Sequence, residues 1–264
     1  MLTLPLDTSP IMSRIEILNL AGLRHDNRRP YELRACAFTL AAHPQADGSA
    51  GATQGLTHVQ ASVYGPREPR QRSGAAHDHA VVSVEVGVAP WAQGAFGRGK
   101  SRGDKRLVEI AAAIRQTFEP VIQLQLYPRS EIAIHVQVLQ ADGGILPTAI
   151  NAVTLALIDA GVALLDYVAA VSVGLHLKQA LLDLSAPEES DLPALVVASL
   201  PSSGKVTLAQ METRLHVDRF EDMLRLGVDA CAVIKGEMER VVKAHTRSVV
   251  ERMGAATVVA QPQD

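Results

Sequence analysis

Residues 141–161 have the sequence ADGGILPTAINAVTLALIDAG, a glycine turn followed by a long and largely apolar segment. Two adjacent glycines, Gly143 and Gly144, permit a tight turn that other residues resist. Apolar residues then recur at helical spacing, and Gly161 supplies a helix stop. The inward positions are Ile150, Val153, Ala156 and Leu157. The stretch therefore predicts a turn that leads directly into a buried helix.

Segments on both sides of this turn have the β-branched content and the partial alternation of strands. The predicted strands are 35–41, 57–64, 81–86, 121–126, 131–139, 169–174, 180–184, 194–200 and 205–211. One helix is predicted from Leu107 to a stop at Pro120, and a long amphipathic helix from Asp218 to about Met253. The sequence therefore predicts an α+β fold in which a strand–helix organisation occurs in two loosely similar halves.

The expected folded region is 13–253, divided into halves at 13–165 and 166–253. Residues 1–12 are expected to form a disordered extension, and residues 254–264 a disordered tail. The glycine-rich segment 43–55, HPQADGSAGATQG, is expected to be a loop or hairpin tip.

Composition narrows the function classes. The chain has 264 residues, of which 47% are hydrophobic and 20% charged, as in ordinary globular proteins. Aromatic residues make up only 3%, which argues against a base-stacking platform. The net charge of −3 excludes an overall basic coat but permits local basic patches.

Cys36 and Cys231 are far apart and lack metal-type spacing, so a reduced intracellular protein is expected. No apolar run reaches the length of a membrane span.

Two basic loops are the strongest candidates for a binding function. The segments 65–78 and 91–106 combine glycine or proline with clustered Lys and Arg, which suits sequence-independent contact with phosphates. The second loop also holds Trp91, which could stack on a base but more often anchors a loop to the core. His77 and His79 lack a third ligand at a usual spacing, so no metal site is expected.

Five motifs occur in order between about Ser13 and His245. They are Arg24-His25-Asp26-Asn27-Arg28-Arg29 with Glu32 and Arg34, Tyr64-Gly65-Pro66-Arg67-Glu68, Lys105-Arg106-Leu107-Val108-Glu109-Ile110, Gln140-Ala141-Asp142-Gly143-Gly144 and Ala156 to Gly161. Together they resemble the ribonuclease PH superfamily, specifically its exosome-ring branch that is similar to the archaeal catalytic ring subunit. Asn27 departs from the family's opening motif, which has glycine there. The resemblance implies a ribonuclease PH fold, related to the second domain of ribosomal protein S5.

Active members of this superfamily cleave RNA by phosphorolysis. Phosphate must then be held by backbone N–H groups and a guanidinium before it attacks. The resemblance places this site at Gly143 and Gly144, which in active relatives are followed by a hydroxyl or small residue and then an arginine. Here those positions are Ile145 and Leu146, and neither side chain binds an anion. We therefore expect a degenerate phosphate site without catalytic residues or cofactors.

The acidic residues of active relatives have two possible counterparts. In those relatives a Glu-Asp pair is followed six residues later by another Asp. Glu189 can replace the first Asp, but Leu195 then lies six residues on. Alternatively, Asp191-Leu192-Pro193 corresponds to the family's Asp-Val-Pro after a shortened loop. A solvated acidic turn is a third interpretation of residues 183–193.

By resemblance, both basic loops point into the central channel of a ring that threads single-stranded RNA. The expected RNA-binding residues are Arg67, Arg70, Arg72, Ser73, Arg98, Lys100, Arg102, Lys105 and Arg106. The arginines at 24, 28, 29 and 34 are expected to form structural ion pairs with Glu32 or Asp26 rather than to contact RNA.

The leading hypothesis is a non-catalytic structural and RNA-channel subunit of the RNA exosome core. Its implied partners are other ribonuclease PH-like subunits in a hetero-hexamer, S1/KH cap proteins, a hydrolytic exoribonuclease and single-stranded RNA. The resemblance further implies roles in rRNA processing and mRNA decay, in the nucleus, nucleolus and cytoplasm. The alternatives are an active phosphate-dependent 3′→5′ exoribonuclease and an RNA-binding protein outside any ring.

Overall fold

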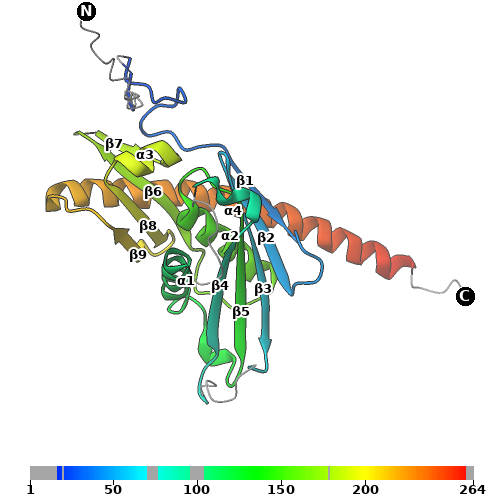
Figure 1. Ribbon diagram of the computed structural model, residues 1–264. Coiled ribbons are helices and arrows are strands. Elements are labelled where there is room, and N and C mark those ends of the chain that lie inside the picture. Colours follow the sequence, from blue (N-terminus) through cyan, green and yellow to red (C-terminus); the bar gives the residue numbers. More distant parts are fainter. Residues whose placement is uncertain (1–16, 20, 70–76, 96–103, 178, 260–264) are drawn as a thin grey trace, which may run out of the picture.

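The computed structural model describes residues 17–259 except residues 20, 70–76, 96–103 and 178 (Figure 1). In chain order the elements are β1 (Cys36–Leu40), β2 (Gly48–Gln54), β3 (Thr57–Arg67), β4 (Val81–Val88), the 3-10 helix η2 (Pro90–Ala95), α1 (Lys105–Phe118), the 3-10 helix η3 (Leu124–Leu126), β5 (Glu131–Gln140), α2 (Ile145–Asp159), β6 (Ala169–His176), β7 (Gln179–Leu182), α3 (Ala186–Asp191), β8 (Ala194–Leu200), β9 (Lys205–Met211) and α4 (Val217–Val259). The α+β class is therefore confirmed.

Two sheets form the framework. The first has the strand order β1-β2-β3-β5-β4, and the second has the order β7-β6-β8-β9. All pairs are antiparallel except β4 with β5, which run parallel. The first sheet uses residues 36–140 and the second residues 169–211, so each sheet comes from one continuous part of the chain.

Helix α2 lies between the two sheets and is buried on every side. All its residues from Leu146 to Leu157 are buried, whereas the sequence pattern predicted only one inward face. Two polar side chains satisfy the backbone of β6 and of the residue before it. The Asn151 side chain exchanges hydrogen bonds of 2.8 and 3.0 Å with Ala170, and Thr154 Oγ1 donates to the Val168 carbonyl at 2.8 Å. Such bonds offset the cost of burying polar groups.

The predicted loop or hairpin tip at 43–55 is confirmed only for residues 43–47, which connect β1 to β2, because residues 48–54 form the buried strand β2. Its sequence, GSAGATQ, has no large β-branched residue except threonine and gave no strand signal. Packing explains the glycine at position 48. A Cβ atom at Gly48 would lie 2.2 Å from the backbone nitrogen of Ala160 and 2.4 Å from the Ala156 carbonyl oxygen. Only glycine permits β2 to approach α2 so closely.

The predicted strand at 121–126 is also wrong. Val121 and Ile122 are buried, and Ile122 forms only an isolated bridge with Leu164. The chain then turns through η3 at residues 124–126. The apolar residues at this position therefore indicate burial and not a strand that is paired in a sheet.

Helix α4 covers the face of the second sheet opposite α2 and continues past the first sheet (Figure 1). It ends at Val259, six residues beyond the predicted end at about Met253. Gly254 follows Met253 directly but is only weakly unfavourable in a helix, and no proline occurs before Pro262. Among the helices in the described part of the chain, none has the length and apolar character needed to cross a membrane.

Candidate functional site at the N-terminus of helix α2

The predicted glycine turn adopts a backbone that favours glycine at both positions. Gly143 has φ 74° and Gly144 has φ 60°, both in the left-handed region. A Cβ atom at Gly143 would lie 2.6 Å from the backbone carbon of Ser185 and 2.7 Å from the nitrogen of Ala186. The turn therefore packs directly against the connection between β7 and α3, in the half of the chain that forms the second sheet.

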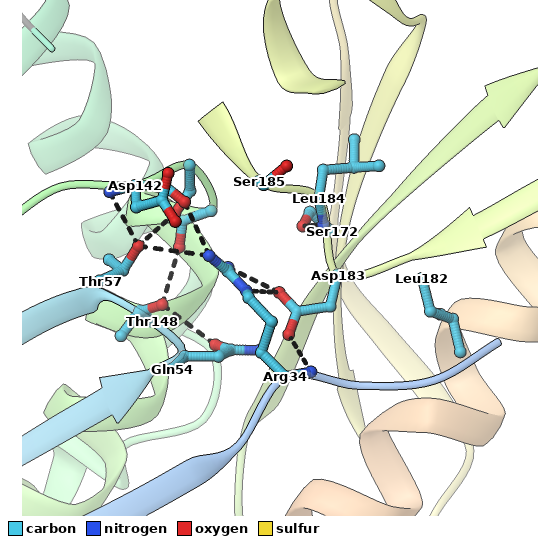
Figure 2. Close-up of polar contacts among 12 residues, drawn as sticks. Arg34, Gln54, Thr57, Asp142, Thr148, Ser172, Leu182, Asp183, Leu184 and Ser185 are labelled. Atoms are coloured by element: carbon cyan, nitrogen blue, oxygen red, sulfur yellow. Dashed lines mark hydrogen bonds and ion pairs between the residues drawn. The ribbon is translucent and has the colours of Figure 1, made fainter. Parts of the chain in front are cut away.

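A buried ion pair holds this contact between the two halves (Figure 2). Nε and Nη2 of Arg34 donate to Asp183 Oδ1 at 2.9 and 2.7 Å, and the Arg34 backbone N–H donates to Asp183 Oδ2 at 2.9 Å. Arg34 Nη1 donates to the carbonyl of Asp142 at 2.7 Å. Thr57 Oγ1 donates to the Gly143 carbonyl at 2.7 Å. The glycine turn is thus tied to the segment before β1, to β3 and to the end of β7.

A second buried pair joins Arg24 to Glu188 in α3. Arg24 Nε donates to Glu188 Oε1 at 2.7 Å, and its other nitrogens donate to Glu188 and to the carbonyls of Leu182 and Asp183. Burial raises the pKa of Glu188, but hydrogen bonds from Arg24 and Ser185 outweigh this effect and the pKa is lowered overall. Glu188 is therefore a charged structural residue.

The interpretation of residues 183–193 as a solvated acidic turn is wrong for Asp183 and Glu188, which are buried. Residues 186–191 form the short helix α3, and Glu188 accepts a hydrogen bond from the N–H of Ser185 at 2.9 Å. This is a capping box, and its Ser-x-x-Glu signature in residues 185–188 was available in the sequence. Asp191 is exposed at the end of α3.

The arginine predictions are partly confirmed. Arg28 Nε lies 2.6 Å from Asp26 Oδ2, as predicted. Glu32 accepts a hydrogen bond from the backbone N–H of Arg29 at 3.0 Å. The partners predicted for Arg24 and Arg34 are wrong, because both side chains reach across to the second sheet's half of the chain. Sequence separations of 149 and 164 residues left no local signal for these pairs.

A carboxylate of the chain itself occupies the start of α2. Gly144 is the N-cap residue of this helix, and its backbone N–H donates to Glu189 Oε2 at 3.0 Å. The positive end of the helix dipole favours a negative group at this place. Ile145 is half-buried and Leu146 is buried in the core cluster. The Glu189 carboxylate therefore engages the Gly144 N–H, which is the first backbone donor at this helix N-terminus.

The two basic loops begin at opposite ends of the first sheet. Arg67 ends β3 and pairs with Glu131 at the start of β5, whereas Val88 ends β4 beside Val138 near the end of β5. The eight residues of β4 correspond to roughly 25 Å of extended chain. The second loop therefore starts at the same end of the sheet as the glycine turn, which follows β5, and Arg67 lies at the other end.

The predicted RNA-binding residues are only partly within the described chain. Arg70, Arg72, Ser73, Arg98, Lys100 and Arg102 lie outside the described residues. Arg67 places its guanidinium 4.8 Å from the centre of the Tyr64 ring and 3.5 Å from Asp47 Oδ2, with 42% of its side chain exposed. Lys105 and Arg106 are exposed at the start of α1.

Trp91 is 77% exposed in η2. The interpretation of Trp91 as an anchor on this chain's own core is therefore wrong. The residues described include no group of three or more His, Cys, Asp or Glu side chains placed to hold a metal ion.

The sequence matches the 3′ exoribonuclease family of ribonuclease PH, with domain 1 at residues 32–163 and domain 2 at residues 166–230. The chain belongs to the ribonuclease PH family. It is 42% identical over 245 residues to the human exosome complex component RRP41, covering 92% of this chain and all of that protein. It is 35% identical over 247 residues to the exosome complex component SKI6 of Saccharomyces cerevisiae, again covering 92% of this chain and all of the relative.

Solved structures of the ribonuclease PH family confirm the predicted fold. Rice Rrp46 superimposes with a TM-score of 0.75 at 26% identity, covering 83% of this chain and all of that one. A chain of the Archaeoglobus fulgidus exosome with RNA bound to the active site gives a TM-score of 0.71 at 20% identity, covering 82% of this chain and 93% of that one. The resemblance drawn from the five motifs is thereby confirmed.

Proposed function

We propose that this ribonuclease PH family chain is a non-catalytic structural and RNA-channel subunit of an RNA exosome core. It would form a hetero-hexameric ring with other ribonuclease PH-like subunits and contact S1/KH cap proteins. A separate hydrolytic exoribonuclease would perform the 3′→5′ cleavage of the RNA. Sequence identity to exosome components over most of the chain supports the proposed assembly into a ring. The occupied N–H at the N-terminus of α2 supports the proposed absence of catalysis.

The observation that carries the non-catalytic role is the hydrogen bond from the Gly144 N–H to Glu189. Phosphate entering here would meet a carboxylate already bound to the N–H, and like charges repel. Leu146, at the position where the resemblance implies an arginine, is buried, and its side chain offers no donor. The Arg34 guanidinium beside Gly144 is already paired with Asp183, and the Gly144 N–H is engaged by Glu189. Without a free guanidinium at position 146, inorganic phosphate is neither held nor oriented for attack.

The direct test is an assay for phosphorolysis. End-labelled RNA is incubated with the full chain, and separately with the reconstituted complex lacking its hydrolytic nuclease, with and without excess phosphate. No nucleoside diphosphate should appear in either reaction, while an active archaeal ring run in parallel releases it. Phosphate-dependent, processive release of nucleoside diphosphates by this chain would overturn the proposal.

The basic residues of the second loop are proposed to contact passing RNA. Lys105 and Arg106 are exposed at the start of α1, so reversing both to Glu should weaken binding of single-stranded RNA. Each phosphate that the variant no longer neutralises should reduce the salt slope by roughly 0.7. Arg115→Glu is the matched control, because Arg115 lies on the same helix, is half-exposed and pairs with Glu119.

In the reconstituted complex, the Lys105 and Arg106 reversal should slow the decay of RNAs long enough to thread the ring and spare short ones. The decay assay uses both lengths together with a thermal melt of each variant. Equal decay of long RNA by the reversed and control complexes would mean that these residues are surface charge only.

Roles in rRNA processing and mRNA decay, in the nucleus, nucleolus and cytoplasm, are part of the same proposal. Affinity purification of the tagged chain followed by mass spectrometry tests the assembly, and fluorescence imaging tests the compartments. Recovery of the chain free of other ribonuclease PH-like subunits would contradict the ring assignment.

A further inference from the structure

An open groove of about 470 Å³ lies between the segment before β1 and the helix α4. Residues 31–33 form one wall and one face of α4 forms the other, with Leu182 of β7 and Ala230 of α4 between them. Tyr31 and Val233 lie on opposite walls, and each is 60% exposed. Large apolar side chains facing one another across an open groove indicate a binding surface.

Hydrogen bonds and ion pairs of Arg28 and Arg34 hold one wall of this groove in place. Leu182 N–H donates to the Pro30 carbonyl at 2.8 Å, which joins the end of β7 to the segment before β1. Arg28 Nη1 donates to the carbonyls of Glu32 and Asp183 at 3.1 and 3.2 Å. The Arg34–Asp183 pair anchors the same segment a few residues later (Figure 2). A wall held by these contacts needs little reorganisation when a ligand binds.

The charge of the groove restricts its occupant. The two charged residues that line it, Glu32 and Asp229, are both carboxylates, and they lie on opposite walls. Arg225, the residue before the lining residue Leu226, is already paired with Glu221 at 2.6 Å. RNA would be repelled here. A second copy of this chain docked by a two-fold axis would place each pair of carboxylates against the same pair.

We propose that this groove docks a short segment of another protein, with one or two large apolar side chains flanked by Lys or Arg. The apolar side chains would fill the space between Tyr31 and Val233, and the basic groups would pair with Glu32 and Asp229. None of the residues that line this groove belongs to the glycine turn or to α2, and the proposal does not rest on whether that site binds phosphate.

The test measures binding of three synthetic peptides to the full chain by fluorescence anisotropy at low salt. All three are 15-residue helix-forming peptides, and the first carries Leu and Phe at i, i+3, i+4 and i+7 between Lys and Arg residues. The second replaces the basic residues by Glu, and the third replaces the apolar residues by Ser. The basic, apolar peptide should bind at least about tenfold more tightly than either of the others.

Variants connect this preference to the groove. Val233→Asp should weaken the basic peptide's binding about tenfold, while Val250→Asp, at a similarly exposed position 17 residues further along α4, should leave it unchanged. Changing Glu32 and Asp229 together to Lys should transfer the preference to the acidic peptide. The proposal would be overturned if the three peptides bound equally well or if the two valine variants had equal effects. It would also be overturned if the chain self-associated and Val233→Asp abolished that self-association.

Discussion

Removal of the Asp183 carboxylate tests how the two halves of the molecule are held together. Asp183 is fully buried and Arg34 is 6% exposed, and three hydrogen bonds of 2.7 to 2.9 Å join them. In Asp183→Ala the guanidinium of Arg34 would stay buried without its counter-charge. Breaking a buried pair in this way costs about 3–5 kcal/mol. For a chain of this size the melting temperature should fall by about 10 °C.

The measurement is urea denaturation and thermal melting of the full chain, followed by circular dichroism. Glu119→Ala is the matched control, because it breaks the half-exposed pair with Arg115 and should cost only about 0.3–0.5 kcal/mol. The double variant Arg34→Met with Asp183→Leu should lose less stability than the two single changes added together, since no charge is left buried. If Asp183→Ala and Glu119→Ala destabilise equally, the pair does not hold the halves together.

Three further substitutions probe the packing of β2, the Arg24–Glu188 pair and the start of α2. Gly48→Ala should destabilise the protein by about 1–3 kcal/mol, because the added Cβ would meet the backbone of α2. Gly236→Ala is the control, because it has open space around it on α4 and should be neutral or stabilising. Chemical denaturation of both variants measures the difference. Hydrogen bonds lower the pKa of Glu188 below its ordinary 4.5. The stability that the Arg24–Glu188 pair contributes is therefore complete above about pH 5, and it is lost as the pH falls through the lower pKa of the folded state. Glu188→Gln should therefore flatten the fall in melting temperature as the pH drops below about 5, and an unchanged profile would contradict this. Leu146→Arg should leave phosphate-dependent product release undetectable, because the carboxylate from α3 still engages the N–H at the start of α2; appearance of nucleoside diphosphate in the labelled-RNA assay would refute that reasoning.

Local sequence patterns were sufficient for the helix at 145–159 and for the glycine turn before it. Apolar residues at helical spacing predicted the helix, although its residues 146–157 are buried on every side, and glycine at a left-handed position reflects sterics within the residue itself. The same reasoning located β3, β4 and β5, where alternation of small and β-branched residues matches one buried face. The family motifs added the fold, because they lie in register along most of the chain.

Tertiary structure decided the features whose causes are distant in sequence. Strand β2 gave no strand signal because it consists mainly of small residues, and one of them, Gly48, is required by the close approach of the α2 backbone. The partners of Arg24 and Arg34 lie in the other half of the chain, so only the folded arrangement could bring them together. The family resemblance named Glu189 as one candidate counterpart of an acidic residue in active relatives, but it gave no hydrogen-bond partner for its carboxylate. Folding brings it to the Gly144 N–H, because the dipole of a helix built from other residues favours a negative charge at that end.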